Sequence, residues 1–157
     1  MNCLIVAGLL FLCSFPSFAA QETEVNDTAA VADVLDPVIT GNLHSLTDVD
    51  WFSFPVTLPQ TMTVSFDVGS TLGSLEYWDV SIRDASGKIL AAADTGKNIE
   101  FSTHIPDPGT YYLVVQKGSF SSENYFSTDQ YTITSSFGAG TGGVETEVND
   151  TPDTPAV

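Results

Sequence analysis

The chain has almost no cysteine: the two that occur, Cys3 and Cys13, both lie within its first 20 residues. These residues carry no charged side chain, and their apolar run, Leu4–Phe15, is shorter than the roughly 20 residues that span a bilayer. Ser17-Phe18-Ala19 supplies the small residues of a cleavage site, so we predict a secretory signal peptide over residues 1–19. The mature chain then has no cysteine, which excludes disulfides, thiol catalysis and cysteine-based zinc sites.

Lys and Arg are missing from the predicted signal peptide, which departs from the usual pattern. A lipoprotein signal with Cys13 as the lipidated residue is the alternative. It requires a small residue just before the cysteine, and Leu12 is not small. We therefore expect a mature protein that is secreted to the extracellular space or the periplasm, without a membrane anchor.

Basic side chains are also scarce, since four Lys and Arg stand against 20 Asp and Glu and give a formal net charge of −16. Binding to nucleic acid or to an anionic membrane needs clustered Lys and Arg, so both partners are disfavoured. The excess of acid either keeps an exported protein soluble or is partly neutralised by bound divalent cations. The composition leaves both explanations open.

Motifs for catalysis are absent from the sequence. The two histidines, His44 and His104, are isolated along the chain, and neither a His-Glu-x-x-His motif nor a Gly-x-Ser-x-Gly motif occurs. Acidic pairs such as Asp48 and Asp50 have the residue types of a glycosidase site, but a small all-β domain offers no sugar-binding cleft between them. We predict no catalytic residues and expect that the protein is not an enzyme.

Helical periodicity is missing as well, whereas apolar and polar residues alternate in several segments, as they do in half-buried strands. Tyr111–Val115 is apolar on both faces, which is typical of a central strand. Asp84–Gly87 predicts a hairpin turn, and Thr28–Leu35 predicts a helical turn or a loop. Strands are predicted at Val38–Leu43, Trp51–Val56, Thr61–Val68, Trp78–Arg83, Lys88–Ala92, Ile99–Phe101, Tyr111–Val115 and Tyr131–Phe137. About eight strands at this spacing favour an all-β fold, an antiparallel β-sandwich of the jelly-roll type.

The most distinctive feature that the chain does contain is a repeated hexapeptide. Glu-Thr-Glu-Val-Asn-Asp occurs at Glu22–Asp27 and again at Glu145–Asp150, and threonine follows each copy. The copies are separated by the length of a small domain, and a glycine-rich stretch precedes the second. We predict a β-sandwich over residues 22–137, a linker over 138–144 and the truncated start of a second repeat over 145–157, in which the second copy is disordered.

The hexapeptide is rich in the oxygen donors that hard cations prefer. Ca²⁺ takes six to eight oxygens at about 2.3–2.6 Å, which is more than one extended segment supplies. A second acidic pair with the same spacing lies just before the strand that starts at Trp51. The candidate metal ligands are Glu22, Glu24, Asn26, Asp27, Asp48 and Asp50. The alternative is a solvated acidic linker, which composition alone does not separate from a metal site.

Four motifs in this order resemble the bacterial pre-peptidase C-terminal domain family. They are Glu22–Asp27, Ile39–Leu43, Asp48–Phe54 and Pro108–Val115. The resemblance covers residues 22–137, and the chain is similar to the collagen-binding domains of bacterial collagenases. It implies a jelly-roll sandwich that accompanies a secreted protease or another exported protein.

The same resemblance implies Ca²⁺ held by the candidate ligands above, with Asn42 as a further candidate. Thr47 stands where some members of the family carry another acid, which leaves the number of calcium ions open. It also implies binding of an extracellular polymer or protein matrix by exposed aromatic side chains on one sheet face. The candidates are Trp51, Tyr77, Trp78, Tyr112 and Tyr125. The alternative is that most of these aromatic residues belong to the core or its rim.

Three functions are compatible with the sequence. We favour a non-catalytic, secreted, calcium-stabilised module that binds extracellular matrix or substrate as an accessory to a secreted protease. The alternatives are a secretion or folding accessory that is cleaved off in maturation, and a structural cell-surface repeat of which this chain is a fragment.

Overall fold

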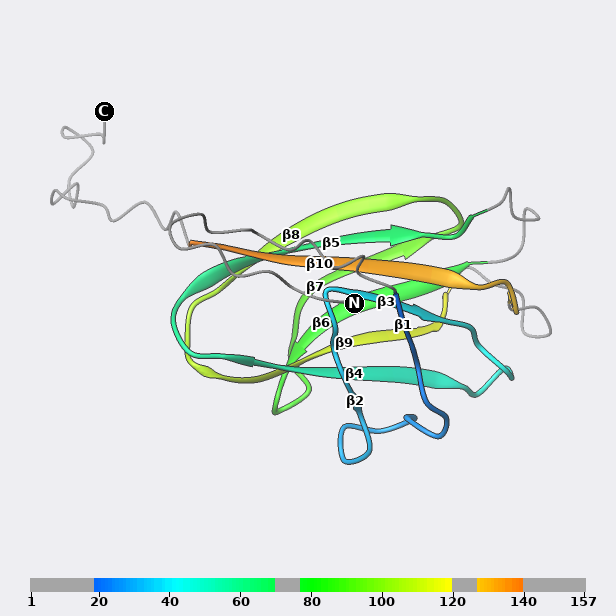
Figure 1. Ribbon diagram of the computed structural model, residues 1–157, viewed down its shortest axis with the longest axis horizontal. Helices are drawn as coiled ribbons and strands as arrows, with labels where there is room; N and C mark the ends of the chain where they lie inside the picture. Colours follow the sequence, from blue (N-terminus) through cyan, green and yellow to red (C-terminus); the bar gives the residue numbers. More distant parts are fainter. Residues whose placement is uncertain (1–18, 70–76, 120–126, 140–157) are drawn as a thin grey trace, which may run out of the picture.

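The computed structural model describes residues 19–69, 77–119 and 127–139, and these residues form ten β-strands and no helix (Figure 1). The strands are β1 (Ala20–Gln21), β2 (Asp33–Val34), β3 (Val38–Gly41), β4 (Val49–Val56), β5 (Gln60–Asp67), β6 (Trp78–Asp84), β7 (Ile89–Thr95), β8 (Ile99–Ile105), β9 (Gly109–Lys117) and β10 (Tyr131–Ala139). The eight longer strands match the eight that the sequence predicts. The two short ones, β1 and β2, were not predicted. No helix within the described ranges has the length and apolar character needed to cross a membrane.

The strands form two five-stranded sheets that pack together as a β-sandwich. Sheet A has the order β1-β3-β10-β5-β8, and sheet B has the order β2-β4-β9-β6-β7. Without the two short strands these orders are 3-10-5-8 and 4-9-6-7, in which most connections cross from one sheet to the other. This is the strand order of a jelly roll, so the predicted architecture is confirmed.

The sandwich also contains two short parallel strand pairs, which the sequence did not predict. The eight longer strands pair only antiparallel, but β1 runs parallel to β3 and β2 runs parallel to β4. Each parallel pair is two residues long and lies at a sheet edge. In each pair, a short N-terminal segment runs alongside a longer strand that comes later in the sequence. Such short edge segments have too few residues for an alternation pattern.

The core lies between the sheets and contains the side chains that the alternation predicts. Phe52 and Phe54 of β4 point inward, and their neighbours Trp51 and Ser53 lie on the outer face, partly exposed. The other buried apolar residues of the long strands are Ile39, Val56, Met62, Val64, Phe66, Trp78, Val80, Ile82, Ile105, Tyr111, Leu113, Val114, Val115, Tyr131 and Ile133. The prediction of a central strand at Tyr111–Val115 is confirmed, since β9 is the middle strand of sheet B.

Several local predictions can be compared with the structure. Asp84–Gly87 forms the predicted hairpin turn between β6 and β7, and Gly87 adopts a φ of 85°, a conformation that favours glycine. β10 continues through Gly138 to Ala139, so the strand extends two residues into the predicted linker. Thr28–Leu35 contains a turn followed by β2, with no helical turn. The signal peptide before Ala19, the linker beyond Ala139, Tyr125 and the second hexapeptide copy lie outside the described residues.

Candidate metal centre

The first hexapeptide copy crosses one side of the sandwich, from β1 at the edge of sheet A to β2 at the edge of sheet B (Figure 1). Backbone hydrogen bonds hold it at both ends. The Glu22 N–H donates to the Thr40 carbonyl at 2.9 Å, and the Trp51 N–H donates to the Asn26 carbonyl at 3.1 Å. The hexapeptide therefore lies against the end of β3 and the start of β4, where its side chains meet Asp48 and Asp50.

Three carboxylates meet in an inner cluster made of Glu22, Glu24 and Asp50, whose nearest oxygens all lie within 4.8 Å of one another. Glu22 is 7% exposed and Asp50 is fully buried, whereas Glu24 lies at the surface. The Tyr131 hydroxyl is 3.0 Å from Glu22 Oε2 and also contacts Asp50 Oδ2. The Asn42 N–H donates to Glu22 Oε1 at 2.6 Å. Oδ1 of Asp50 is buried and has no hydrogen-bond partner.

The electrostatics of the inner cluster disfavour a metal-free, fully ionised state. Burial raises the pKa of Asp50 to about 9, and the nearby charges of Glu22 and Asp48 act in the same direction, while the hydrogen bond from Tyr131 opposes them. Burial also raises the pKa of Glu22. Because Tyr131 has a single hydroxyl proton, it satisfies one carboxylate at a time. The second buried carboxylate needs either a proton of its own or a bound cation.

A second group, the outer cluster, consists of Glu24, His44 and Asp48, with ligand atoms again within 4.8 Å of one another. His44 Nδ1 contacts Glu24 Oε1 and is 3.6 Å from Asp48 Oδ2, and the His44 N–H donates to the same Asp48 oxygen. Glu24 belongs to both clusters, so they form one continuous site. The sequence interpretation treated His44 as isolated and missed it. The only local signal was its spacing of four residues from Asp48.

The donor chemistry of the inner cluster fits a hard divalent cation. Its three ligands are carboxylates, which suit Ca²⁺, whereas the imidazole of the outer cluster suits a transition metal better. The side chain of Asn26 is fully buried beside this region, and both of its amide atoms lack a partner. Buried polar groups without partners are rare in native proteins, and a bound ion is one way to supply the missing partner of the amide oxygen.

Two further predicted ligands are placed differently by the structure. Asp27 belongs to neither cluster, and its Oδ1 accepts a hydrogen bond from the Val49 N–H at 3.3 Å. Asn42 contributes its backbone N–H to Glu22, while its side-chain Nδ2 is 3.4 Å from His44 Nε2. Both residues hold neighbouring segments in position, and their role as direct ligands stays a prediction.

Gly41 makes room for the inner cluster. A Cβ atom at this position would overlap Glu22 Oε2 and the Tyr131 hydroxyl. The close approach of β3 to these two groups thus requires a residue without a side chain. Gly41 was not among the site residues that the sequence suggested.

The aromatic candidates for ligand binding do not form one surface. Trp78 is fully buried in the core against Phe66, at 5.7 Å between ring centroids, so its prediction as a ligand-binding residue is wrong. Trp51 and Tyr112 lie together on the outer face of sheet B, with ring centroids 5.4 Å apart and only partly buried. The guanidinium of Arg83 lies 5.6 Å from the centre of the Trp51 ring, a cation–π arrangement.

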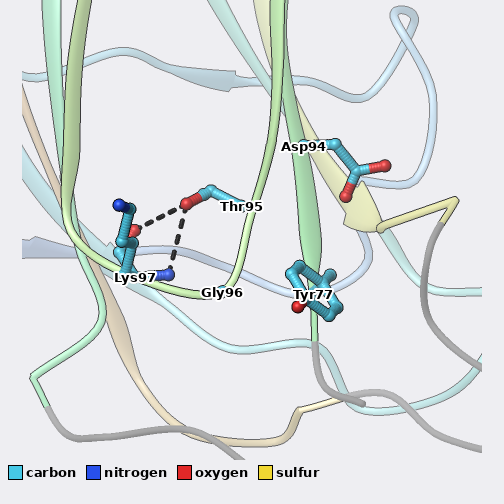
Figure 2. Close-up of a pocket in the computed structure, with 5 residues that line it drawn as sticks. All are labelled: Tyr77, Asp94, Thr95, Gly96 and Lys97. Carbon is cyan, nitrogen blue, oxygen red and sulfur yellow. Dashed lines mark hydrogen bonds between the residues drawn. The ribbon is translucent and has the colours of Figure 1, made fainter. Parts of the chain in front are cut away.

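Tyr77 borders a small pocket at the edge of sheet B. Figure 2 shows Asp94 and Thr95 at the end of β7, Gly96 and Lys97 in the turn that follows, and Tyr77 beside them. The pocket has a volume of about 260 Å³. The Thr95 hydroxyl donates to the Lys97 carbonyl at 2.8 Å, and the Lys97 N–H donates back to the hydroxyl at 3.2 Å, which closes the turn. The pocket is separate from the metal centre, because none of its residues belongs to either cluster.

Comparisons with known proteins identify the fold but no family. No family model matches the chain, and no curated protein matches its sequence. Among solved structures, the chain is similar to the pre-peptidase C-terminal domain of a collagenase from Bacillus anthracis, with a TM-score of 0.50 and 19% identity over 78% of this chain and 99% of that one. It is also similar to PliG, a periplasmic inhibitor of g-type lysozyme from Aeromonas hydrophila, with a TM-score of 0.50 and 14% identity over 76% of this chain and 96% of that one. The chain therefore has a fold like that of the pre-peptidase C-terminal domain.

Proposed function

We propose that this protein is a non-catalytic β-sandwich module of the extracellular space or periplasm, stabilised by Ca²⁺ at the inner cluster. The observation that carries the proposal is Asp50, a fully buried carboxylate with an unpartnered oxygen, grouped with Glu22 and Glu24. The two structurally similar proteins support a module without catalytic activity of its own, since one is a domain attached to a collagenase and the other is an inhibitor.

A bound cation would stabilise the module by neutralising charges that folding brings together. Glu22 approaches Asp48 and Asp50 from a different segment, and no Lys or Arg pairs with any of the three among the described residues. When Ca²⁺ is bound, Glu22, Glu24 and Asp50 would supply carboxylate oxygens, while Tyr131 and the Asn42 N–H hold Glu22 in place. The cation then links the edges of the two sheets through the hexapeptide.

Thermal unfolding with and without metal tests this proposal. Millimolar Ca²⁺ added to metal-free protein should raise the melting temperature, and EDTA should reverse the rise. Because a ligand at 100 times its dissociation constant stabilises by about 2.7 kcal/mol, the shift is measurable. Mg²⁺ and Zn²⁺ serve as comparisons, and a larger shift with Zn²⁺ would favour the outer cluster and its histidine. Melting curves that are identical for the metal-free protein and with Ca²⁺, Mg²⁺ and Zn²⁺ would refute a cation site.

We further propose that the outer face of sheet B binds an extracellular polymer or protein matrix, such as collagen or a polysaccharide. The neighbouring rings of Trp51 and Tyr112, with Arg83 over Trp51, support this role. A pull-down on collagen, chitin and other insoluble polymers tests it, with the variant Trp51→Ala, Tyr112→Ala as the control. If the polymers retain the unmodified protein and the double variant equally, this face of sheet B is not the binding surface. A role as an accessory of a secreted protease rests on the same binding.

A further inference from the structure

The first hexapeptide copy makes its hydrogen bonds to the rest of the sandwich through both its side chains and its backbone. The Glu22 carboxylate accepts hydrogen bonds from the Asn42 N–H and Tyr131, and its backbone N–H donates to Thr40. Asn26 is fully buried and accepts from the Trp51 N–H. The place along β3 and β4 that the hexapeptide occupies, which we call the groove, therefore holds a short peptide sequence with side chains at defined positions.

The second copy offers the same sequence to this groove. Glu145–Asp150 is identical to Glu22–Asp27, and Thr151 matches Thr28. The second copy therefore carries the same carboxylate and backbone groups that make the hydrogen bonds described above, and the same amide side chain that is buried at Asn26. The differences come just before it, where Gly143 and Val144 replace Ala20 and Gln21. Val144 would lose the hydrogen bond that joins the Gln21 side chain to the Thr40 hydroxyl at 3.0 Å.

The length of chain after Ala139 limits how far the second copy reaches toward the groove of its own molecule. Tyr131, at the start of β10, reaches the site, and Ala139 is eight residues further along an extended strand, about 26 Å away. Figure 1 shows β10 running from the region of β3 to the opposite end of the sandwich. Glu145 follows Ala139 by six residues, which span at most about 22 Å when fully extended. A second molecule has no such restriction.

We propose that the groove exchanges its own hexapeptide for the second copy of another molecule of this chain. The surfaces that give and receive the peptide differ, so the contact is head to tail and builds either closed rings or open chains. The groove's own copy is tethered to it and has the advantage of a high effective concentration. Association of the unmodified chain is therefore weak, and it strengthens when the first copy is weakened. This inference goes beyond the proposed function and does not need the metal, because both copies carry the same ligands.

The test weakens one copy at a time in the full chain. The acceptor variant carries Glu22→Ala and Asn26→Ala, and a matched variant adds Glu145→Ala and Asn149→Ala. In sedimentation velocity at increasing concentration, the acceptor variant should form oligomers, and the matched variant should remain monomeric. Runs in EDTA and in Ca²⁺ should agree in this ranking, so that the failure of a calcium site and the failure of exchange are distinguishable. An acceptor variant that is folded and monomeric at every concentration overturns the proposal, as do oligomers that survive in the matched variant.

A second measurement does not depend on the folding of the acceptor variant. A fluorescent peptide with the sequence of residues 142–151 is titrated with the unmodified chain at millimolar concentration, which is on the order of the effective concentration of a tethered segment. Its anisotropy should rise more than that of a scrambled peptide, and at least tenfold less protein should be required with a folded acceptor variant. Equal anisotropy for the two peptides with the unmodified chain overturns the proposal.

Discussion

Two aspartates at opposite ends of sheet B show how differently the sandwich treats the same side chain. Asp50 lies near the start of β4, fully buried, and burial raises its pKa to about 9. Asp84 ends β6 at the hairpin turn, where hydrogen bonds from Ser86, together with that of the Lys88 N–H, lower its pKa. One end of the sheet thus satisfies its carboxylate with the turn itself, and the other end leaves a carboxylate with an unpartnered oxygen.

The difference lies in where the hydrogen-bond donors come from. All donors to Asp84 follow it within four residues, and a tight turn places them there whatever the rest of the chain does. The group that faces Asp50 is the hydroxyl of Tyr131, which is 81 residues away in sequence. Only the closed jelly roll brings the two together. Because the long-range site has too few donors for its acids, it is suited to a cation.

Of the changes that test this comparison, removing two carboxylates of the inner cluster should have the largest effect on stability. In the double variant Glu24→Ala, Asp50→Ala, the stabilisation by Ca²⁺ should disappear, a loss of about 2.7 kcal/mol at 100 times the dissociation constant of the unmodified protein. Thermal unfolding with Ca²⁺ and with EDTA measures it, and Asp84→Ala is the control that should keep the full shift. If the double variant retains the shift of the unmodified protein, the inner cluster does not hold the ion.

Adding a side chain at Gly41 should disturb the same site, because β3 would have to move away from the cluster. The Cβ of Gly41→Ala would overlap Glu22 and Tyr131, and such overpacking costs about 1–3 kcal/mol of unfolding free energy. Gly138→Ala in β10 is the matched control, because a Cβ there meets nothing within 4 Å. Denaturant unfolding of both variants measures the difference. Equal stability of the two variants would mean that β3 moves away from the cluster without cost.

The fold could be predicted from the sequence because its signals are local. The alternation of Phe52 and Phe54 with outward-facing neighbours, the double-sided apolar run at Tyr111–Val115, and the turn at Asp84–Gly87 each reflect a few adjacent residues. The short parallel strands β1 and β2 could not be predicted, since two residues carry no period and their pairing depends on the edges that the other strands leave open.

The site could be predicted only in part, for the same reason. Spacing and donor type in the sequence indicated Glu22, Glu24 and Asp50, which the structure brings together. Their partners Tyr131 and Gly41 looked like ordinary core and strand residues, because contacts across many residues of sequence leave no local pattern. Trp78 shows the opposite case, since the family resemblance implied an exposed aromatic candidate there and the side chain is fully buried in the core.

The stability of the metal-free protein should change with pH in opposite directions for the carboxylates at the two ends of the sheet. The pKa of Asp50 is 3.8 when unperturbed and about 9 in the folded protein, so between these values the folded state holds a proton that the unfolded state has lost. Stability in EDTA should therefore fall as the pH rises from 6 to 7, by at most about 1.4 kcal/mol for this group. Denaturant unfolding at the two pH values measures the fall. Asp50→Asn should reduce it, and an unchanged slope in that variant would assign the effect to other groups.

The smallest effect is expected from Asp84→Asn, and it should have the opposite sign. The pKa of Asp84 is lowered by its hydrogen bonds, so its carboxylate contributes stability above the unperturbed value of 3.8, and this contribution is lost as the pH falls through the lowered value. The variant should therefore melt slightly below the unmodified protein at pH 7 and at the same temperature in strong acid. Asp50→Asn in EDTA should melt above the unmodified protein at pH 7, because an amide needs no cation or proton to be buried. If both variants shift the melting temperature in the same direction, the two carboxylates do not differ in the way that their surroundings indicate.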